Sequence, residues 1–195
     1  MKTLDYFRTL ALALVIAAGS VCAGEGPAFK KDDHNLSAGL SYSWDYGMGL
    51  AVAWDKGAIN DMFSFGAGFD YSAKSYEHYV GYIAFEPYAF RKYRERYITP
   101  SFRFAFHVFG IPALAERPNL AKHDVFAVLR LGPQIWFRSF DSDFPTGHYF
   151  YNHSKNGVNF MWDVASGYRF HFNEKAHLWA QVGYYGSVIG IGLKF

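Results

Sequence analysis

Most of this sequence alternates, residue by residue, between bulky apolar side chains and small or polar ones. From position 160 to 172 the even residues are Phe, Trp, Val, Ser, Tyr, Phe and Phe, whereas the odd residues between them are Met, Asp, Ala, Gly, Arg and His. A period of two places neighbouring residues on opposite faces of a β-strand, so this segment predicts a strand with one apolar and one polar face. The pattern does not fit a helix, in which apolar residues recur every three or four positions.

The same alternation recurs in seven further segments, which gives eight predicted strands. Their approximate ranges are 36–44, 50–55, 63–71, 98–108, 129–137, 159–172, 178–184 and 188–195. Long connections are predicted at 73–93, 110–122 and 141–157, and the second of these can hold a short helix. Pro100 and Pro133 fall inside predicted strands. Proline cannot donate to the ladder, so we expect bulges or strand ends at these two positions.

Residues 1–23 have the organisation of a secretory signal peptide. Lys2 and Arg8 precede an apolar run at 10–18, and the small residues at 21–23 fit cleavage after Ala23. The alternatives are a buried N-terminal helix and a lipoprotein anchor at Cys22, but the residues before Cys22 lack the Leu and the small residue that such anchors prefer. Cleavage would leave a short periplasmic segment at 24–34 and a barrel at 35–195, without any cysteine.

Composition excludes several classes of protein. Aromatic residues make up 21% of the chain and hydrophobic residues 51%, yet the mean hydropathy is only −0.08. Disordered chains are poor in aromatic residues, and the apolar run at 10–18 is about half the roughly 20 residues that a membrane-spanning helix needs. The net charge of +2 gives no reason to expect a nucleic-acid partner.

Residue size indicates which face of the strands lines the interior. The polar face is rich in small residues such as Gly66, Gly68, Gly132 and Ala105, which suit the narrow interior of an eight-stranded barrel. The apolar face is uniformly bulky, as expected of a surface exposed to lipid. A soluble barrel with its apolar face turned inward around a ligand is the alternative. We therefore predict an all-β fold: a closed, eight-stranded, antiparallel, up-and-down transmembrane β-barrel with a polar lumen and an apolar exterior.

Aromatic residues on the apolar face also suit the two membrane interfaces. The candidates for such interfacial girdles are Trp44, Trp54, Tyr71, Trp162, Tyr168 and Tyr184.

The final predicted strand ends on an aromatic residue. Ile189, Ile191 and Leu193 alternate before Phe195, and this row resembles the assembly signal that the barrel-assembly machinery reads in outer-membrane proteins. With the segments 35–40, 55–61, 65–69, 164–172 and 190–195, the sequence resembles the small OmpA-like, porin-like eight-stranded barrels of the Gram-negative outer membrane. The resemblance implies an outer-membrane location, contact with outer-membrane lipids and a monomer. It implies fold and location far better than any activity.

Charged and amide side chains on the polar face are predicted to form a network inside the barrel. Its members are Asp55, Asp70, Arg103, His107, Arg130, Gln134, Arg138, Asp163, Arg169, His171, Gln181 and Lys194. An eight-stranded barrel is about wide enough for side chains to fill, so we expect an ion-paired plug. Because basic residues outnumber acidic ones in this set, a narrow pore that prefers anions is the alternative.

The predicted outer loops offer further functional hypotheses. The loops at 73–93 and 141–157 are candidates for an extracellular ligand, although the first can equally be a hairpin extension whose basic residues meet anionic lipid headgroups. His148, His153 and Ser154 allow an outer-membrane lipid-modifying enzyme, such as an acyl hydrolase of lipid A, but no spacing defines a triad. No metal site or cofactor is predicted. We expect a structural or surface-interaction protein and not an enzyme.

Overall fold

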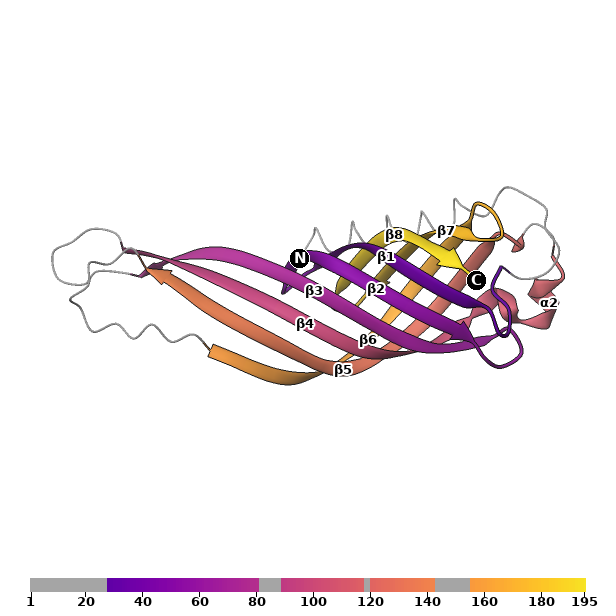
Figure 1. The fold of residues 1–195 in the computed structure, drawn as a ribbon, viewed down its shortest axis with the longest axis horizontal. Coiled ribbons are helices and arrows are strands. Elements are labelled where there is room, and N and C mark those ends of the chain that lie inside the picture. The colour runs from indigo at the N-terminus through magenta and orange to yellow at the C-terminus, as the bar shows by residue number, and fades with distance from the viewer. Residues whose placement is uncertain (1–27, 81–88, 118–119, 143–154) are drawn as a thin grey trace.

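Eight antiparallel strands form a closed barrel in the computed structural model, which describes residues 28–80, 89–117, 120–142 and 155–195. Each strand pairs with its neighbours in sequence, and β1 pairs with β8 to close the sheet (Figure 1). The strands are β1 (His34–Ser43), β2 (Gly47–Gly57), β3 (Phe63–Val80), β4 (Ala89–His107), β5 (His123–Ser142), β6 (Lys155–His171), β7 (Ala176–Gly183) and β8 (Gly186–Lys194). The predicted fold class is confirmed.

The two ends of the barrel differ. At the end that we call proximal, β1 begins and β8 finishes, and His34 and Phe195 exchange two backbone hydrogen bonds of 3.0 and 2.9 Å. The connection from β4 to β5 also lies here and contains the short helices η2 (Val108–Gly110) and α2 (Pro112–Ala115), where a short helix was predicted. The opposite end, where β1, β3, β5 and β7 finish, is called distal.

Three of four neighbouring strands, β3, β4 and β5, are much longer than predicted, and the fourth, β6, begins four residues earlier than predicted, at Lys155. β3, β4, β5 and β6 contain 18, 19, 20 and 17 residues, against 8 to 11 in the other four strands. They extend beyond the rest of the barrel as a four-stranded sheet (Figure 1). Long loops were predicted over 73–93 and 141–157, but residues 73–80, 89–93, 141–142 and 155–157 belong to strands. The alternative for 73–93, a hairpin extension of two strands, is correct for the described residues. Polar residues occupy both faces of β3 beyond Ala73, which removes the alternation that marks a strand.

The apolar rows face outward and the polar rows face inward, as predicted. Leu40, Phe160 and Ile191 are 60%, 73% and 69% exposed, whereas Asp163 and Arg169 are fully buried. One candidate for the interfacial girdles is wrong. Tyr168 is buried, and its hydroxyl lies 2.7 Å from Nδ1 of His123 at the start of β5.

Pro100 and Pro133 produce neither a bulge nor a strand end. Pairing between β4 and β5 stops after Ile98 with Ile135 and resumes at Phe102 with Leu131, so the same number of residues is bypassed on each strand. The register is unchanged and both strands continue through the gap. The two prolines lie opposite each other inside it, which confines the missing ladder contacts to one place in the wall.

Candidate functional site in the charged lumen

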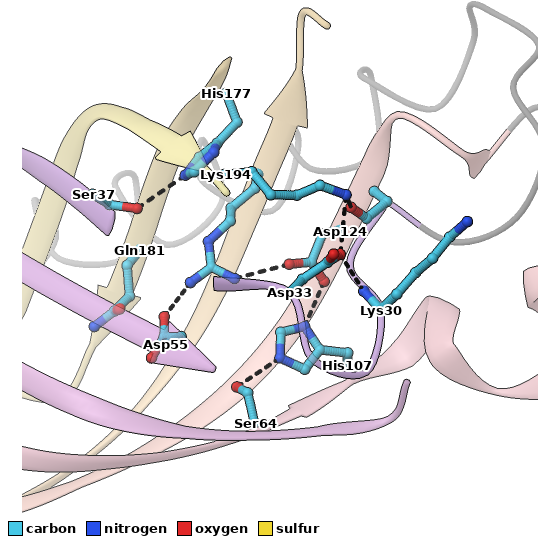
Figure 2. A network of polar contacts seen from close by, with 12 residues as sticks. Lys30, Asp33, Ser37, Asp55, Ser64, His107, Asp124, His177, Gln181 and Lys194 are labelled. Atoms are coloured by element: carbon cyan, nitrogen blue, oxygen red, sulfur yellow. Dashed lines mark hydrogen bonds and ion pairs between the residues drawn. The ribbon is translucent and has the colours of Figure 1, made fainter. Parts of the chain in front are cut away.

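A chain of polar side chains crosses the proximal half of the lumen. Its members come from β2, β3, β4, β5, β6 and β7, and all are buried. In order along the chain of contacts they are Gln181, Arg103, Asp55, Arg169, Asp124, His107 and Ser64. The contacts link strands on opposite sides of the barrel wall, such as β2 and β6, so they cross the space that a pore would need. Figure 2 shows the part of the chain of contacts that contains Asp55, Asp124, His107 and Ser64.

Two carboxylates hold this proximal network together. Asp55 accepts a 2.8 Å hydrogen bond from Nε of Arg103 and a second bond from Arg169. Asp124 accepts from Arg169 at 3.0 Å and from Nδ1 of His107 at 2.7 Å. Two carboxylates therefore balance two guanidinium groups, which is the condition under which buried charges are tolerated.

Aromatic rings pack against the same network. The guanidinium carbon of Arg169 lies 4.4 Å from the ring centroid of Phe126 and 5.7 Å from that of Phe29. Phe29 stacks on His107 with ring centroids 4.4 Å apart and is itself 2% exposed. Gly167 makes room for this packing, because a Cβ at that position would overlap the ring of Phe126. The small residues of the inner face thus make space for large lumen side chains.

A second ionic contact lies in the middle of the lumen. Arg130 donates to Asp163 through Nε at 2.9 Å and to Asp70 through Nη1 at 3.1 Å. The other oxygen of Asp163 accepts the backbone N–H of Tyr184 at 2.9 Å. This group joins β3, β5 and β6.

A small cavity lies beside the middle group and opens toward the distal end. Its volume is about 50 Å³, and Tyr46, Asp70, Arg130, Gln134 and Tyr185 are among the residues that line it. A buried water needs roughly 10–15 Å³ of such space, so the cavity is large enough for a few waters and too small for an organic ligand.

A third polar cluster lies in the distal extension around Glu95. Tyr76 and Tyr97 donate to its carboxylate at 3.0 and 2.7 Å, and Arg138 pairs with it. Burial alone would raise the pKa of Glu95, but the hydrogen bonds from Tyr97, Arg138 and Tyr76 outweigh burial and hold this pKa below its ordinary value.

The remaining predicted lumen residues lie apart from these clusters. Nζ of Lys194 binds the carboxylate of Asp33 at 3.0 Å and the carbonyl oxygen of Ala28 at 3.1 Å, so it fastens residues 28–33 to the proximal end. The ring of His171 lies 5.0 Å from that of His177. Gln134 is buried and lines the distal cavity.

Several lumen residues were not predicted from the sequence. Asp124 and His177 precede the predicted starts of their strands, at 129 and 178. Asp124 continues the inward row of Arg130 through Val128 and Phe126, but these two are apolar, as are Val125 and Ala127 on the outer face. The alternation of apolar and polar residues is lost in this segment. Asp124 could have been predicted only by counting back from Arg130 in steps of two along the inner face of β5. Glu95 adjoins the predicted loop at 73–93 and was missed for that reason.

The hypothetical catalytic residues His148, His153 and Ser154 lie outside the described residues. Within residues 28–80, 89–117, 120–142 and 155–195, no group of three or more His, Cys, Asp or Glu side chains is placed to hold a metal ion. In the same part of the chain, no helix is long and apolar enough to cross a membrane.

A closed eight-stranded barrel with an apolar exterior and a charged, ion-paired interior has the architecture of small outer-membrane β-barrels. Solved structures that share this fold include those of two proteins. One is the attachment invasion locus protein Ail of Yersinia pestis in complex with the heparin analogue sucrose octasulfate, with 14% identity, a TM-score of 0.52, and coverage of 85% of this chain and 99% of that chain. The other is the N-terminal β-barrel domain of OprF of Pseudomonas aeruginosa, with 8% identity, a TM-score of 0.51, and coverage of 85% and 98%.

Neither a protein-family model nor a curated protein matches the sequence. At these identities the two structures establish the fold, and the predicted resemblance to small outer-membrane barrels is confirmed at that level.

Proposed function

We propose that this protein is an outer-membrane barrel whose plugged lumen serves as a membrane anchor and whose distal extension makes contacts outside the cell. The observation that carries the proposal is the exposed apolar exterior. Residues on the outer faces of β1, β2, β3, β4, β6 and β8 leave large apolar side chains in contact with the surroundings; examples are Leu40, Leu50, Phe69, Phe102, Phe160 and Ile191. A soluble protein rarely exposes a contiguous apolar surface of this extent, whereas lipid solvates it.

The plug is supported by the contacts inside the barrel. Two successive groups of ion pairs, around Asp55 and around Arg130, lie one above the other along the lumen. To open a pathway, both groups would have to separate, which would leave charges unpaired at a cost of several kcal/mol each. A non-conducting barrel therefore fits this interior better than an anion-preferring pore.

The orientation follows from the unequal ends. The proximal end carries the start of β1 and the end of β8, and two of its three connections, 58–62 and 172–175, are short. Short turns are typical of the periplasmic side of outer-membrane barrels. The long β3–β6 strands then extend beyond the outer leaflet, where they are available to surface partners.

The outer row of β8 is the proposed assembly signal. Ile189, Ile191, Leu193 and Phe195 are 60%, 69%, 58% and 69% exposed on the lipid-facing side. We expect Phe195→Ala to lower the amount of folded barrel in the outer membrane while leaving refolding in detergent unchanged. The inward-facing substitution Lys194→Arg, which keeps a cation beside Asp33, is the matched control, and an equal loss with both would contradict a signal on the outer face.

Fractionation and conductance test the proposed function together. The protein should remain in the outer-membrane fraction until detergent is added, and a folded sample should migrate differently from a boiled one in electrophoresis. Reconstituted in a planar bilayer, it should show no steady ohmic current. Recovery as a soluble periplasmic protein would overturn the location, and a steady current through the folded barrel would overturn the plug.

A further inference from the structure

The distal extension has an inner face that the other strands do not cover. Pairing of β2 with β3 ends at Met48 with Ala73, and pairing of β6 with β7 ends at Ala165 with Gly183. β3, β4, β5 and β6 continue to pair with one another beyond these points. Within the described residues the extension is therefore half of a barrel wall that continues beyond β1, β2, β7 and β8, and its inner, concave face continues the lumen face of the same four strands (Figure 1).

Aromatic rings line this concave face. The rings of Tyr76 and Tyr93 lie side by side with centroids 5.1 Å apart and an angle of 9° between their planes. Nearer to the lumen, the ring of Tyr97 contacts the ring of Tyr46 in the β1–β2 turn, with centroids 4.3 Å apart. The rings thus form a ladder that leads from the mouth of the lumen outward along the extension.

A fifth ring is fixed on the neighbouring strand. Trp136 packs against the backbone of Gly157, where a Cβ would lie within 2.5–2.6 Å of the indole. The guanidinium carbon of Arg138 lies 5.7 Å from the Trp136 ring. Four of the five rings, those of Tyr76, Tyr93, Tyr97 and Trp136, sit on paired strands, so little of their conformational freedom remains to be lost when a ligand binds them.

The charges on the same face are mostly positive. Nζ of Lys74 lies 5.8 Å from the centroid of Tyr76, and Lys155 is exposed at the start of β6. Glu95 is buried, and its carboxylate is already bound by Tyr76, Tyr97 and Arg138. Among the described side chains of this face none is aliphatic. An apolar peptide side chain would therefore find no aliphatic pocket, whereas the face carries flat rings and basic side chains. Among these, Nζ of Lys74 donates to the carbonyl oxygen of Asp45 at 3.3 Å, and Arg138 uses Nε and Nη2 on Glu95, which leaves its Nη1 for another acceptor.

We propose that this distal platform, formed by Lys74, Tyr76, Tyr93, Trp136 and Arg138, binds an acidic oligosaccharide. The C–H groups on one face of a sugar ring pack on the electron-rich face of an aromatic ring, and carboxylate or sulfate groups pair with Lys and Arg. The ladder suits an extended chain of sugars that lies along the platform, because the cavity below it is only about 50 Å³. The inference rests on the proposed function in one respect: the platform must face the outside of the cell.

Binding of defined oligosaccharides to the folded barrel in detergent micelles tests the proposal. The probes are a heparin hexasaccharide, a hyaluronan hexasaccharide and neutral maltohexaose, measured by isothermal titration calorimetry at fixed ionic strength. Trp136→Ala and Tyr93→Leu should each raise the Kd of the acidic sugars about tenfold or more, as expected for a buried aromatic contact. Phe137→Ala removes the adjacent ring on the outer face of the same strand and should leave the Kd within about twofold.

Charge provides a second matched pair. Lys74→Gln on the platform should weaken binding of both acidic sugars, whereas Arg96→Gln, on the outer face of β4, should not. Absence of binding to either acidic sugar overturns the proposal, as does equal binding of maltohexaose. An equal loss from Trp136→Ala and Phe137→Ala also overturns it. Every variant is checked for the mobility shift of a folded barrel, so failure of sugar binding by a folded, membrane-inserted protein is distinguishable from failure of the proposed function.

Discussion

Asp55 shows how one buried carboxylate can organise a barrel interior. It accepts hydrogen bonds from two arginines of different strands, and it is 1% exposed. We expect Asp55→Asn to lower the free energy of unfolding by about 3–5 kcal/mol, because Arg103 and Arg169 would lose their shared counter-charge inside the barrel. Urea unfolding in detergent micelles measures this effect.

The control for Asp55→Asn is Glu174→Gln, which removes a carboxylate from the exposed β6–β7 turn. Its effect should be within about 0.5 kcal/mol. Equal destabilisation by the two substitutions would show that the lumen contacts of Asp55 add no more to the free energy of unfolding than an exposed carboxylate does.

Gly192 tests the idea that small inner-face residues make space for lumen side chains. A Cβ there would overlap the ring of His177 and lie 2.6 Å from Oγ of Ser37. We expect Gly192→Val to destabilise the barrel by about 1–3 kcal/mol through overpacking. Ala38→Val adds the same kind of bulk on the exposed outer face of β1 and should be tolerated; the reverse order of the two unfolding midpoints would refute the assignment of faces.

At the scale of the strands, sequence periodicity was sufficient for the fold where one face is apolar and the other is small or polar. β1 and β8 satisfy this condition, so both their existence and their facing were predictable. The condition fails in two ways. The first part of β5 is apolar on both faces around Phe126, and the distal part of β3 is polar on both faces around Tyr76. Strand ends and the residues on them were therefore missed at these places.

The lumen site shows the same limit in another form. The inward position of Asp55, Arg103 and Arg169 followed from the alternation, but their partners did not. Contacts across the lumen depend on the register of strands that are distant in sequence and on the length of each side chain. The alternation of residues along one strand gives no information about either. For the same reason, nothing in the sequence indicated that Phe29 would pack on His107.

The distal extension should respond to acid through Glu95. A span of about 9–11 residues from the proximal end of β4 ends near residue 97, so we place Glu95 outside the membrane. The pKa of Glu95 is lower in the folded protein than its ordinary value, so its stabilising contribution is present above the unfolded pKa of about 4.3 and is lost as pH falls through the folded pKa.

Comparison of the protein with Glu95→Gln across pH checks this expectation. The difference between their unfolding free energies should be full near pH 7 and should shrink progressively below about pH 4.3. A difference that stays constant down to pH 2, or that grows on acidification, would contradict the direction of the shift.

At the scale of the whole molecule, the proposal unites an apolar outer surface, a lumen closed by ion pairs and a distal platform that projects from the membrane. The apolar outer surface and the ion-paired lumen both follow from the alternation of residues along each strand. When the bulky residues of a strand face outward, the polar residues between them must face the lumen. The distal platform depends on the unequal lengths of the strands. An inverted, soluble barrel would require the opposite facing of every row.

Lipid contact at individual tryptophans tests this arrangement most directly. Of the five tryptophans, Trp162 is 55% exposed on the outer face and Trp179 is 1% exposed in the lumen. Two single-tryptophan proteins, each with the other four replaced by Phe, would be refolded into vesicles whose acyl chains carry bromine at several depths. We predict strong quenching of Trp162 fluorescence and little quenching of Trp179. Quenching of Trp179 with an unaffected Trp162, or no effect on either in vesicles, would contradict a membrane barrel with this facing.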